Sequence, residues 1–261
     1  LTLYNIQGAA YAGLGQLDAA IESYKQALKI KPDFADAYYN IGIALNNKGD
    51  VEAAIDSFKQ AVKIKPDYAE AYNNMGNALE DKGDLEAAIE SYKQAIKIKS
   101  DYAEAYNNMG IALKGKGDLE AAIDSFKQAL KIQPDDADAY YNMGNALQDK
   151  GDVEAAIDSF KQAVKIKPDY AEAYNNMGIA LKGKGDLEAT IESYKQAIKI
   201  KSDYAEAYNN MGNVLNDKGD VEAAINSFKQ AIKIKPDDAD TYNNMGVALK
   251  DKGELEAAID N

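Results

Sequence analysis

A period of 34 residues runs through the whole chain and constrains its fold more than any other feature. Two series of glycines follow this step, and the five prolines share a third position within it. The members are Gly8, Gly42, Gly76, Gly110, Gly144, Gly178, Gly212 and Gly246, then Gly15, Gly49, Gly83, Gly117, Gly151, Gly185, Gly219 and Gly253, and Pro32, Pro66, Pro134, Pro168 and Pro236. A fixed step of this size is typical of arrays in which each repeat buries its apolar face only against its neighbours.

Each repeat contains two stretches in which apolar residues have helical spacing. The first stretch of the second repeat places an amphipathic stripe at i, i+3, i+4 and i+7, formed by Tyr38, Ile41, Gly42 and Leu45. The second stretch has a similar stripe, formed by Val51, Ala54, Ile55, Phe58, Ala61 and Val62. Gly49 separates the two, because glycine tolerates the left-handed conformation just past a helix end. No strand pattern competes, so we predict an all-α fold with two helices in each repeat.

Proline and aspartate mark the boundary between successive repeats. Pro66 ends a second helix, and Asp67, three residues before Glu70, predicts a capping box at the start of the next helix. A single repeat would bury only a few large side chains, each contributing about 1.5–3 kcal/mol. This gain does not offset the conformational entropy lost when a repeat becomes ordered. We therefore expect the repeats to stack.

These residues resemble the tetratricopeptide repeat (TPR) pattern at its eight signature positions, which are Tyr38, Ile41, Gly42, Leu45, Ala54, Phe58, Ala61 and Pro66. The resemblance covers the whole chain as a single array with repeats at 1–34, 35–68, 69–102, 103–136, 137–170, 171–204 and 205–238, and a partial repeat at 239–261. Departures are few: Gln7, Ser100, Ser202 and Thr190. The resemblance implies a right-handed superhelical solenoid of antiparallel helix pairs. In that family the first helix of each pair lines a concave groove that binds a peptide or a partner helix.

Composition argues against catalysis, cofactors and nucleic acid. The chain has neither cysteine nor histidine, so thiolate metal sites and imidazole-assisted nucleophiles cannot form. Its acidic pairs recur from repeat to repeat, and the run from Asp237 to Asp240 lacks the glycine of a calcium loop. A net charge of −13 disfavours phosphate-rich partners. We expect a protein that is not an enzyme and holds no cofactor or metal.

The sequence also carries no signal for a membrane. No apolar run approaches the roughly 20 residues that a transmembrane helix needs, and no targeting segment opens the chain. We expect no membrane partner, and the cytoplasm is the favoured location. Leu1 already lies inside a repeat, so we expect the chain to be a piece of a longer protein.

Three positions of the first helix vary between repeats, whereas most positions change conservatively. One of them, four residues after the signature glycine, holds Asn46, Glu80, Lys114, Gln148, Lys182, Asn216 and Lys250. The position after the signature tyrosine is Tyr39 or Tyr141 in two repeats and asparagine in others. The position after the signature glycine is apolar in some repeats and asparagine in others, as in Ile111, Ile179, Asn77 and Asn145. In the resembled family these positions face the groove, and we predict that they bind peptide. The alternative is drift at exposed sites after duplication.

One position next to these does not vary after the first repeat: Asn40, Asn74, Asn108, Asn142, Asn176, Asn210 and Asn244. Asparagine is about 0.6 kcal/mol less favourable than alanine inside a helix. A side-chain amide offers both a donor and an acceptor, and it can therefore pair with a peptide main chain. The row resembles the asparagine ladder in the repeat domain of O-linked N-acetylglucosamine transferases. The alternative is that duplication copied one ancestral asparagine.

The charge of the predicted groove constrains its partner. The second residue of each first helix is acidic, as in Asp36, Glu70 and Glu104, so we expect a neutral or basic peptide. The favoured hypothesis is a noncatalytic interaction scaffold. Two alternatives stay open: the substrate-presenting arm of a larger, glycosyltransferase-like enzyme, and an array that associates end to end. For the last, we expect the apolar residues Tyr242, Met245 and Leu249 to be only partly covered.

Overall fold

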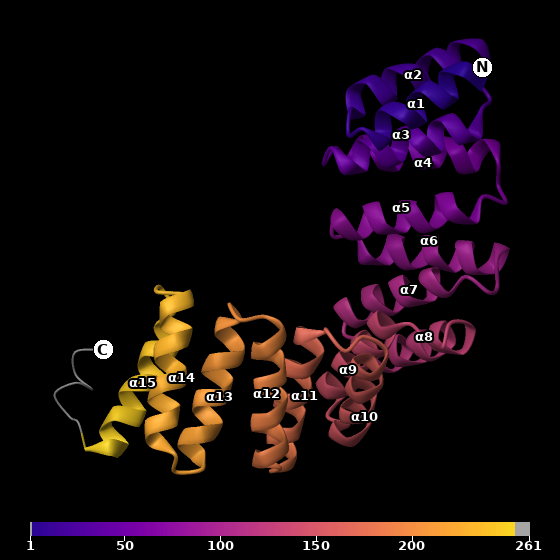
Figure 1. Ribbon diagram of the computed structural model, residues 1–261. Helices are drawn as coiled ribbons and strands as arrows, with labels where there is room; N and C mark the ends of the chain where they lie inside the picture. The colour runs from indigo at the N-terminus through magenta and orange to yellow at the C-terminus, as the bar shows by residue number, and fades with distance from the viewer. Residues whose placement is uncertain (1, 254–261) are drawn as a thin grey trace. The chain divides into compact units, whose positions relative to one another are not determined.

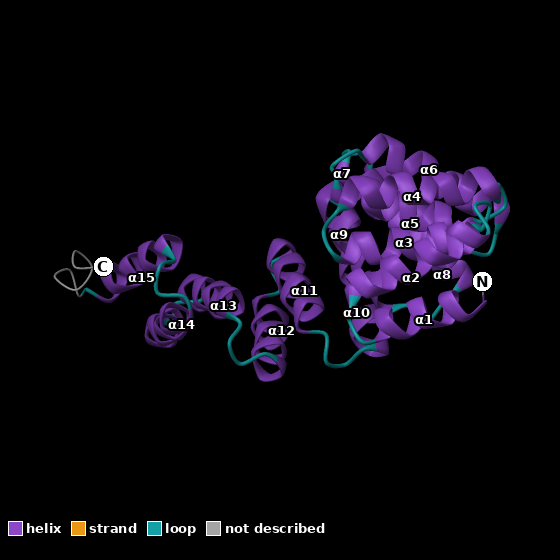
Figure 2. Cartoon of the chain, turned by 90° about the horizontal axis from the view of Figure 1, so that it is seen from above, coloured by secondary structure: helices purple, strands orange, loops and turns teal. Residues whose placement is uncertain are grey.

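The computed structural model describes residues 2–253, and within this range all regular structure is α-helical (Figure 2). The fifteen helices there are α1 Thr2–Gly13, α2 Leu17–Ile30, α3 Ala35–Asn47, α4 Val51–Ile64, α5 Ala69–Asp81, α6 Leu85–Ile98, α7 Ala103–Gly115, α8 Leu119–Ile132, α9 Ala137–Lys150, α10 Val153–Ile166, α11 Ala171–Lys184, α12 Leu187–Ile200, α13 Ala205–Asp217, α14 Val221–Ile234 and α15 Ala239–Lys252. The predicted all-α fold is confirmed.

The chain forms two compact halves, Leu1–Pro134 with α1–α8 and Asp135–Asn261 with α9–α15. In each half a short turn joins two helices that pack against each other, such as α3 and α4 (Figure 1). The second helix of a pair then packs on the first helix of the next pair in the same half, as α4 does on α5. Each half is therefore a stack of helix pairs, and only neighbouring pairs contribute to its core.

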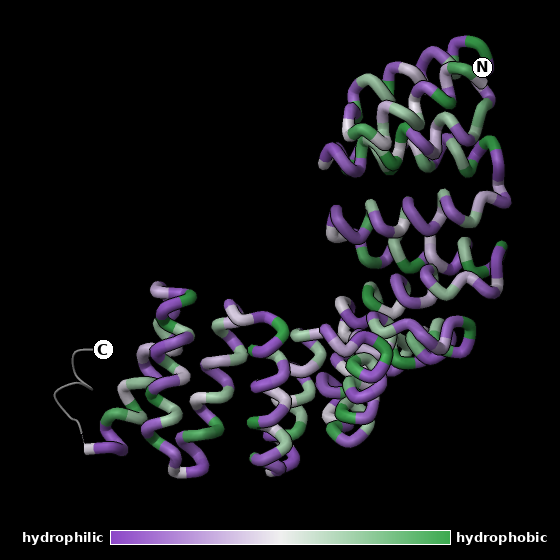
Figure 3. The backbone as a smooth tube through the Cα atoms, in the orientation of Figure 1, coloured by the Kyte–Doolittle hydropathy of each residue, from purple (hydrophilic) through white to green (hydrophobic). Residues whose placement is uncertain are grey.

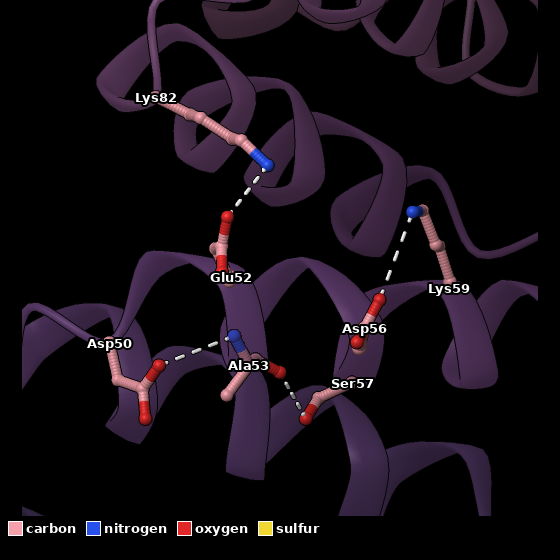
Figure 4. A network of polar contacts seen from close by, with 7 residues as sticks. All are labelled: Asp50, Glu52, Ala53, Asp56, Ser57, Lys59 and Lys82. Atoms are coloured by element: carbon pink, nitrogen blue, oxygen red, sulfur yellow. Dashed lines mark hydrogen bonds and ion pairs between the residues drawn. The ribbon is translucent and has the colours of Figure 1, made fainter.

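Glycine and aspartate form the turn inside each pair from α3–α4 to α13–α14, whereas the turn between α1 and α2 has Gly15 and Gln16. Gly49 has a φ of +82° between α3 and α4, a conformation that L side chains rarely adopt. Asp50 then caps α4, because its carboxylate accepts a hydrogen bond from the backbone N–H of Ala53 at 3.4 Å (Figure 4). The end of the preceding helix and the start of the following one are thus fixed by two consecutive residues.

The predicted cap at Asp67 is wrong. Tyr68 is the residue that precedes α5, and no side chain caps this helix. The Tyr68 ring packs instead against Tyr39, with 4.9 Å between the ring centroids, and the Lys65 ammonium lies 4.2 Å from the Tyr68 centroid. Aromatic packing therefore positions the start of α5. In α9 the equivalent residue is Asp136, which does cap its helix by accepting from Asp138 and Ala139.

The core of each pair forms where an aromatic ring of the second helix lies on a glycine of the first. Phe58 is 1% exposed, and its Cε1 would lie 2.6 Å from a Cβ atom at position 42. Hydrophobic and hydrophilic residues follow one another within each helical turn, so each helix has an apolar and a polar side (Figure 3). The apolar side of α4 joins Met75, Leu79 and the fully buried Tyr92 in one cluster that continues into the next pair.

The expectation that Met245 and Leu249 are only partly covered is wrong. Each is 6% exposed, because both pack on the preceding helix α14 around Ile225 and Phe228. Tyr242 packs partly buried against the same cluster. The second helix of the last predicted repeat falls outside residues 2–253.

Ion pairs link successive helix pairs at the surface. The turn lysine of one pair reaches the first turn of the second helix in the pair before, as Lys82 reaches Glu52 at 3.0 Å (Figure 4). Lys116 with Glu86 at 2.9 Å and Lys218 with Glu188 at 2.7 Å repeat this contact. Exposed pairs of this kind contribute about 0–1 kcal/mol each, so the stack depends mainly on its apolar core.

Candidate functional site

The asparagine row lies on one face of the first helices, which we call the asparagine face. It comprises Asn40, Asn74 and Asn108 in the N-terminal half and Asn142, Asn176, Asn210 and Asn244 in the C-terminal half, and all seven side chains are half-buried. Several of these amides hydrogen-bond to the preceding helix pair. Asn74 Nδ2 donates to the Tyr39 hydroxyl at 3.0 Å, and Asn108 Nδ2 donates to Asn73 Oδ1 at 3.2 Å.

The C-terminal half repeats these bonds. Asn176 Nδ2 donates to the Tyr141 hydroxyl at 3.2 Å, Asn210 to Asn175 Oδ1 at 3.3 Å, and Asn244 to Asn209 Oδ1 at 3.1 Å. The acceptor always lies one residue after a signature tyrosine. Either tyrosine or asparagine stands at that position after the first repeat, and each presents an oxygen to the next helix pair.

A second set of acceptors joins the same network. Asn108 Nδ2 also donates to Asn77 Oδ1 at 3.1 Å, and Asn176 Nδ2 donates to Asn145 Oδ1 at 2.8 Å. An amide nitrogen has two hydrogens, so both donors of Asn108 and Asn176 are taken up within the protein. The Asn108 carbonyl oxygen remains to meet a ligand, whereas Asn176 Oδ1 already accepts from Asn175 Nδ2 at 3.3 Å and has one lone pair left.

Asn73 and Asn175 have a structural role that the sequence reasoning missed. Both are fully buried, and each donates to the carboxylate of the next pair's acidic residue, Glu104 at 3.1 Å and Glu206 at 3.2 Å. Buried amides require such partners, because an unpaired polar group loses its hydration without compensation. The sequence signal was the occurrence of asparagine with glutamate 31 residues later, which only the helix packing explains.

Tyr39 and Tyr141 each belong to an aromatic cluster. The Tyr39 ring centroid lies 6.0 Å from that of Phe58, and Tyr141 lies 6.1 Å from Phe160 and 5.0 Å from Tyr170. Burial, together with the charge of Glu70, raises the pKa of the Tyr39 phenol above its usual value. The phenol therefore stays neutral at physiological pH, and it offers a ligand an apolar ring edge beside its hydroxyl.

Ile111 and Ile179 occupy the position of Asn77 and Asn145 in their own helices. Ile111 is 36% exposed and Ile179 is half-buried, where it packs near Ile191 and Tyr194. The face thus alternates between amide and aliphatic side chains at this position. Such alternation gives neighbouring helix pairs different surface chemistry.

A hollow of about 220 Å³ opens on the asparagine face between α3 and α5. Its lining residues are Ile43, Asn46, Asn47, Phe58, Asn74 and Asn77. Asn46 stands at one of the variable positions that the sequence predicts to face the groove, and its Oδ1 atom is buried and has no hydrogen-bond partner. Its Nδ2 atom lies 3.5 Å from Asp81 Oδ2. The hollow therefore combines an aromatic ring, an aliphatic side chain and an unpaired amide oxygen.

The described residues contain neither a metal-binding cluster nor a membrane-spanning helix. Among residues 2–253, no three histidine, cysteine or acidic side chains are grouped so that they could hold a metal ion. No helix in the described part of the chain is both long and apolar enough to cross a bilayer.

The chain matches the family model for the TPR repeat at residues 8–49, 44–83, 76–117, 112–151, 144–185, 183–216 and 212–253. A crystal structure of MamA is similar, with 31% identity, 62% of this chain and 95% of that chain covered, and a TM-score of 0.59. A second similar structure is YrrB, described as a TPR protein with an unusual peptide-binding site, with 26% identity, 76% and 99% coverage and a TM-score of 0.61.

A third similar structure supports the fold alone. It is the C-terminal part of a TPR repeat-containing protein from Cytophaga hutchinsonii, with 15% identity, 91% of this chain and 98% of that chain covered, and a TM-score of 0.74. A search of curated proteins gives no match.

Proposed function

Because the chain belongs to the tetratricopeptide repeat family, whose members typically serve as protein-interaction scaffolds, we propose that it binds an extended polypeptide along the asparagine face without catalysing a reaction. The proposed contacts are the seven row asparagines with Tyr39, Tyr141, Asn77, Asn145, Ile111 and Ile179. YrrB, a structure to which the chain is similar, is described as having a peptide-binding site, and this supports a peptide as the ligand class.

The observation that carries the proposal is the hydrogen-bonded order of the amides. Asn74, Asn108 and Asn176 are held by neighbouring helix pairs before any ligand arrives. A peptide N–H that donates to such an oxygen does not have to immobilise a free side chain, so less conformational entropy is lost on binding. The contacts are to the main chain, and the row therefore tolerates many peptide sequences.

The charge near the row selects against acidic peptides. Asp36, Glu70 and Glu104 are exposed and lie in the first turns of α3, α5 and α7. A carboxylate in the ligand would be repelled by this edge, whereas a neutral or basic segment would not. We therefore expect a neutral to basic partner.

Calorimetry on the intact chain tests the proposal. Peptides of 12 residues are first selected from a random display library, and their affinity is then compared between the parent and the double variant Asn108→Ala, Asn176→Ala. Affinity should fall by about 1–3 kcal/mol for each buried hydrogen bond lost. Gln94→Ala is the matched control, because Gln94 donates to Glu90 on an exposed surface of α6. Equal affinity of the parent and the double variant would exclude the amides as the binding groups.

A second candidate function, self-association, is favoured by α1. Leu3 is 73% exposed and Ile6 is 61% exposed on this helix. Adjacent exposed apolar side chains are typical of interaction surfaces. Sedimentation velocity of the parent and of the variant Leu3→Glu, Ile6→Glu over a range of concentrations tests this. A concentration-dependent increase in the sedimentation coefficient that the variant loses would support it, and identical monomeric behaviour would exclude it.

A further inference from the structure

Asn46, which lines the hollow between α3 and α5, carries a hydrogen-bond acceptor that the protein does not use. Asn46 Oδ1 is buried and unpaired, although the Asn46 amide nitrogen has Asp81 within reach. In native structures most buried polar atoms have a partner, and an exception requires an explanation. Phe58 lines the same hollow and supplies no donor.

The next helix pair shows what fills this place when the protein supplies the donor itself. There Tyr92 stands in the position of Phe58, and Glu80 stands in the position of Asn46. The Tyr92 hydroxyl lies 3.0 Å from Glu80 Oε2 and 2.8 Å from Asn77 Oδ1. One hydroxyl thus separates a satisfied site from the unsatisfied one at Phe58.

The C-terminal half contains the same association of an unpaired oxygen with phenylalanine. Gln148 Oε1 and Asn216 Oδ1 are buried without a partner, and their helix pairs carry Phe160 and Phe228. Phe126 is the exception, because Lys114 stands at the amide position of its pair and has no carbonyl oxygen. The unpaired acceptor therefore follows from the sequence of each pair and is not peculiar to Asn46.

The charge around the hollow favours a cation. Asp81 Oδ2 lies 3.5 Å from the Asn46 amide nitrogen, and helices α3 and α5 contain no lysine or arginine. The lysines that follow these helices are engaged elsewhere: Lys48 pairs with Asp18, and Lys82 pairs with Glu52. A positively charged donor that enters the hollow therefore meets the Asn46 amide and the Asp81 carboxylate beside it.

We propose that the hollow lined by Asn46 and Phe58 is a specificity pocket for a basic side chain of the bound polypeptide, and that the Asn46 amide turns its Oδ1 toward the hollow to accept from that side chain, as Glu80 accepts from the Tyr92 hydroxyl. Lysine and arginine carry donors and no acceptor, which matches a lone acceptor beside the Asp81 carboxylate. The Phe58 ring, 1% exposed, only closes the floor of the hollow. The pocket rests on the proposed function, because the ligand reaches it as part of a peptide on the asparagine face.

Two variants leave no unpaired acceptor at position 46: one satisfies the oxygen from within the protein, and the other deletes it. Phe58→Tyr supplies the internal hydroxyl that Tyr92 supplies naturally, and Asn46→Leu deletes the oxygen while it keeps the volume. Phe126→Tyr is the matched control, because it adds the same hydroxyl to a pair that has no amide oxygen at this position. Thermal unfolding is measured for all three. Phe58→Tyr and Asn46→Leu should unfold no lower than the parent, because each removes an unpaired buried acceptor.

The probe is the random 12-residue display library, selected separately on the parent and on each variant. We expect lysine or arginine to be enriched at one position on the parent and on Phe126→Tyr, and not on Phe58→Tyr or Asn46→Leu. A selected peptide and its lysine-to-methionine analogue are then titrated. The parent should prefer lysine about tenfold or more, whereas the two pocket variants should bind both peptides equally.

The outcomes separate the pocket from the proposed function. Peptides that bind the parent without any basic preference, or whose basic preference survives in both pocket variants, overturn the pocket and leave peptide binding intact. A preference for serine or tyrosine hydroxyls in place of lysine also overturns it. If no peptide is enriched on the parent, the proposed function fails, and the pocket fails with it.

Discussion

Replacing Gly42 by alanine tests how closely the two helices of a pair must approach. A Cβ at this position would lie 2.6, 2.7 and 2.9 Å from three atoms of the Phe58 ring. Real Cβ contacts are almost never shorter than 3.0 Å, and the ring cannot withdraw, because Phe58 is 1% exposed within the core. Overpacking of this kind costs about 1–3 kcal/mol.

Helix propensity acts in the opposite direction. Alanine is about 1 kcal/mol more favourable than glycine inside a helix, so the net loss expected for Gly42→Ala is about 0–2 kcal/mol in the free energy of unfolding. Urea unfolding followed by circular dichroism measures it. Gly183→Ala in α11 is the control, because nothing lies within 4 Å of the added Cβ and φ is not positive there. The control should be stabilised by up to about 1 kcal/mol. If Gly42→Ala is stabilised as much as Gly183→Ala, close helix approach does not explain the glycine.

Three further predictions concern the polar network. Burial raises the pKa of Glu80 above its usual value, and the hydrogen bond from the Tyr92 hydroxyl partly offsets this rise. Tyr92→Phe removes that bond and should therefore raise the pKa of Glu80 further, as NMR titration of the Glu80 carboxyl will measure. Because an acid with a raised folded-state pKa destabilises the fold once it ionises, the loss of stability in Tyr92→Phe should be larger at pH 7 than at pH 4, as urea unfolding at both values will show. Asn108→Ala should destabilise the chain despite its better helix propensity, since two hydrogen bonds worth about 0.5–1.5 kcal/mol each are lost; a thermal midpoint above that of the parent would contradict this. The preference for basic over acidic peptides should narrow between about 0.1 M and about 1 M salt, and calorimetry at both concentrations checks it.

The sequence predicted the helices well because their signals are local. The apolar stripe around Tyr38 and the turn glycine Gly49 act within a few residues, so the number and order of elements followed directly. The error at Asp67 arose because a local capping signal competed with a distant contact. Tyr68 packs on Tyr39 in the preceding helix pair, and this fixes the start of α5 without a cap.

The site was less predictable, because its properties depend on pairs of residues in different repeats. That the asparagines share a face followed from their common position. That Asn73 is buried depends on Glu104, and that Asn108 donates twice depends on Asn73 and Asn77. The unpaired oxygen of Asn46 could not be found from one position alone, since it follows from the absence of a hydroxyl on Phe58.

The hydrogen bonds between helix pairs determine which repeats can be inserted into or deleted from such an array. Tyrosine and asparagine both supply the oxygen to which a row asparagine of the next pair donates, as Tyr39 and Asn73 do. The five row asparagines with this bond are Asn74, Asn108, Asn176, Asn210 and Asn244. Gain or loss of one whole repeat within either half therefore leaves every junction chemically compatible, whichever of the two residues it brings. Insertion of a repeat with alanine at that position would leave the next asparagine without its acceptor. The tyrosine–asparagine choice thus makes the repeats interchangeable, while each repeat keeps a surface of its own.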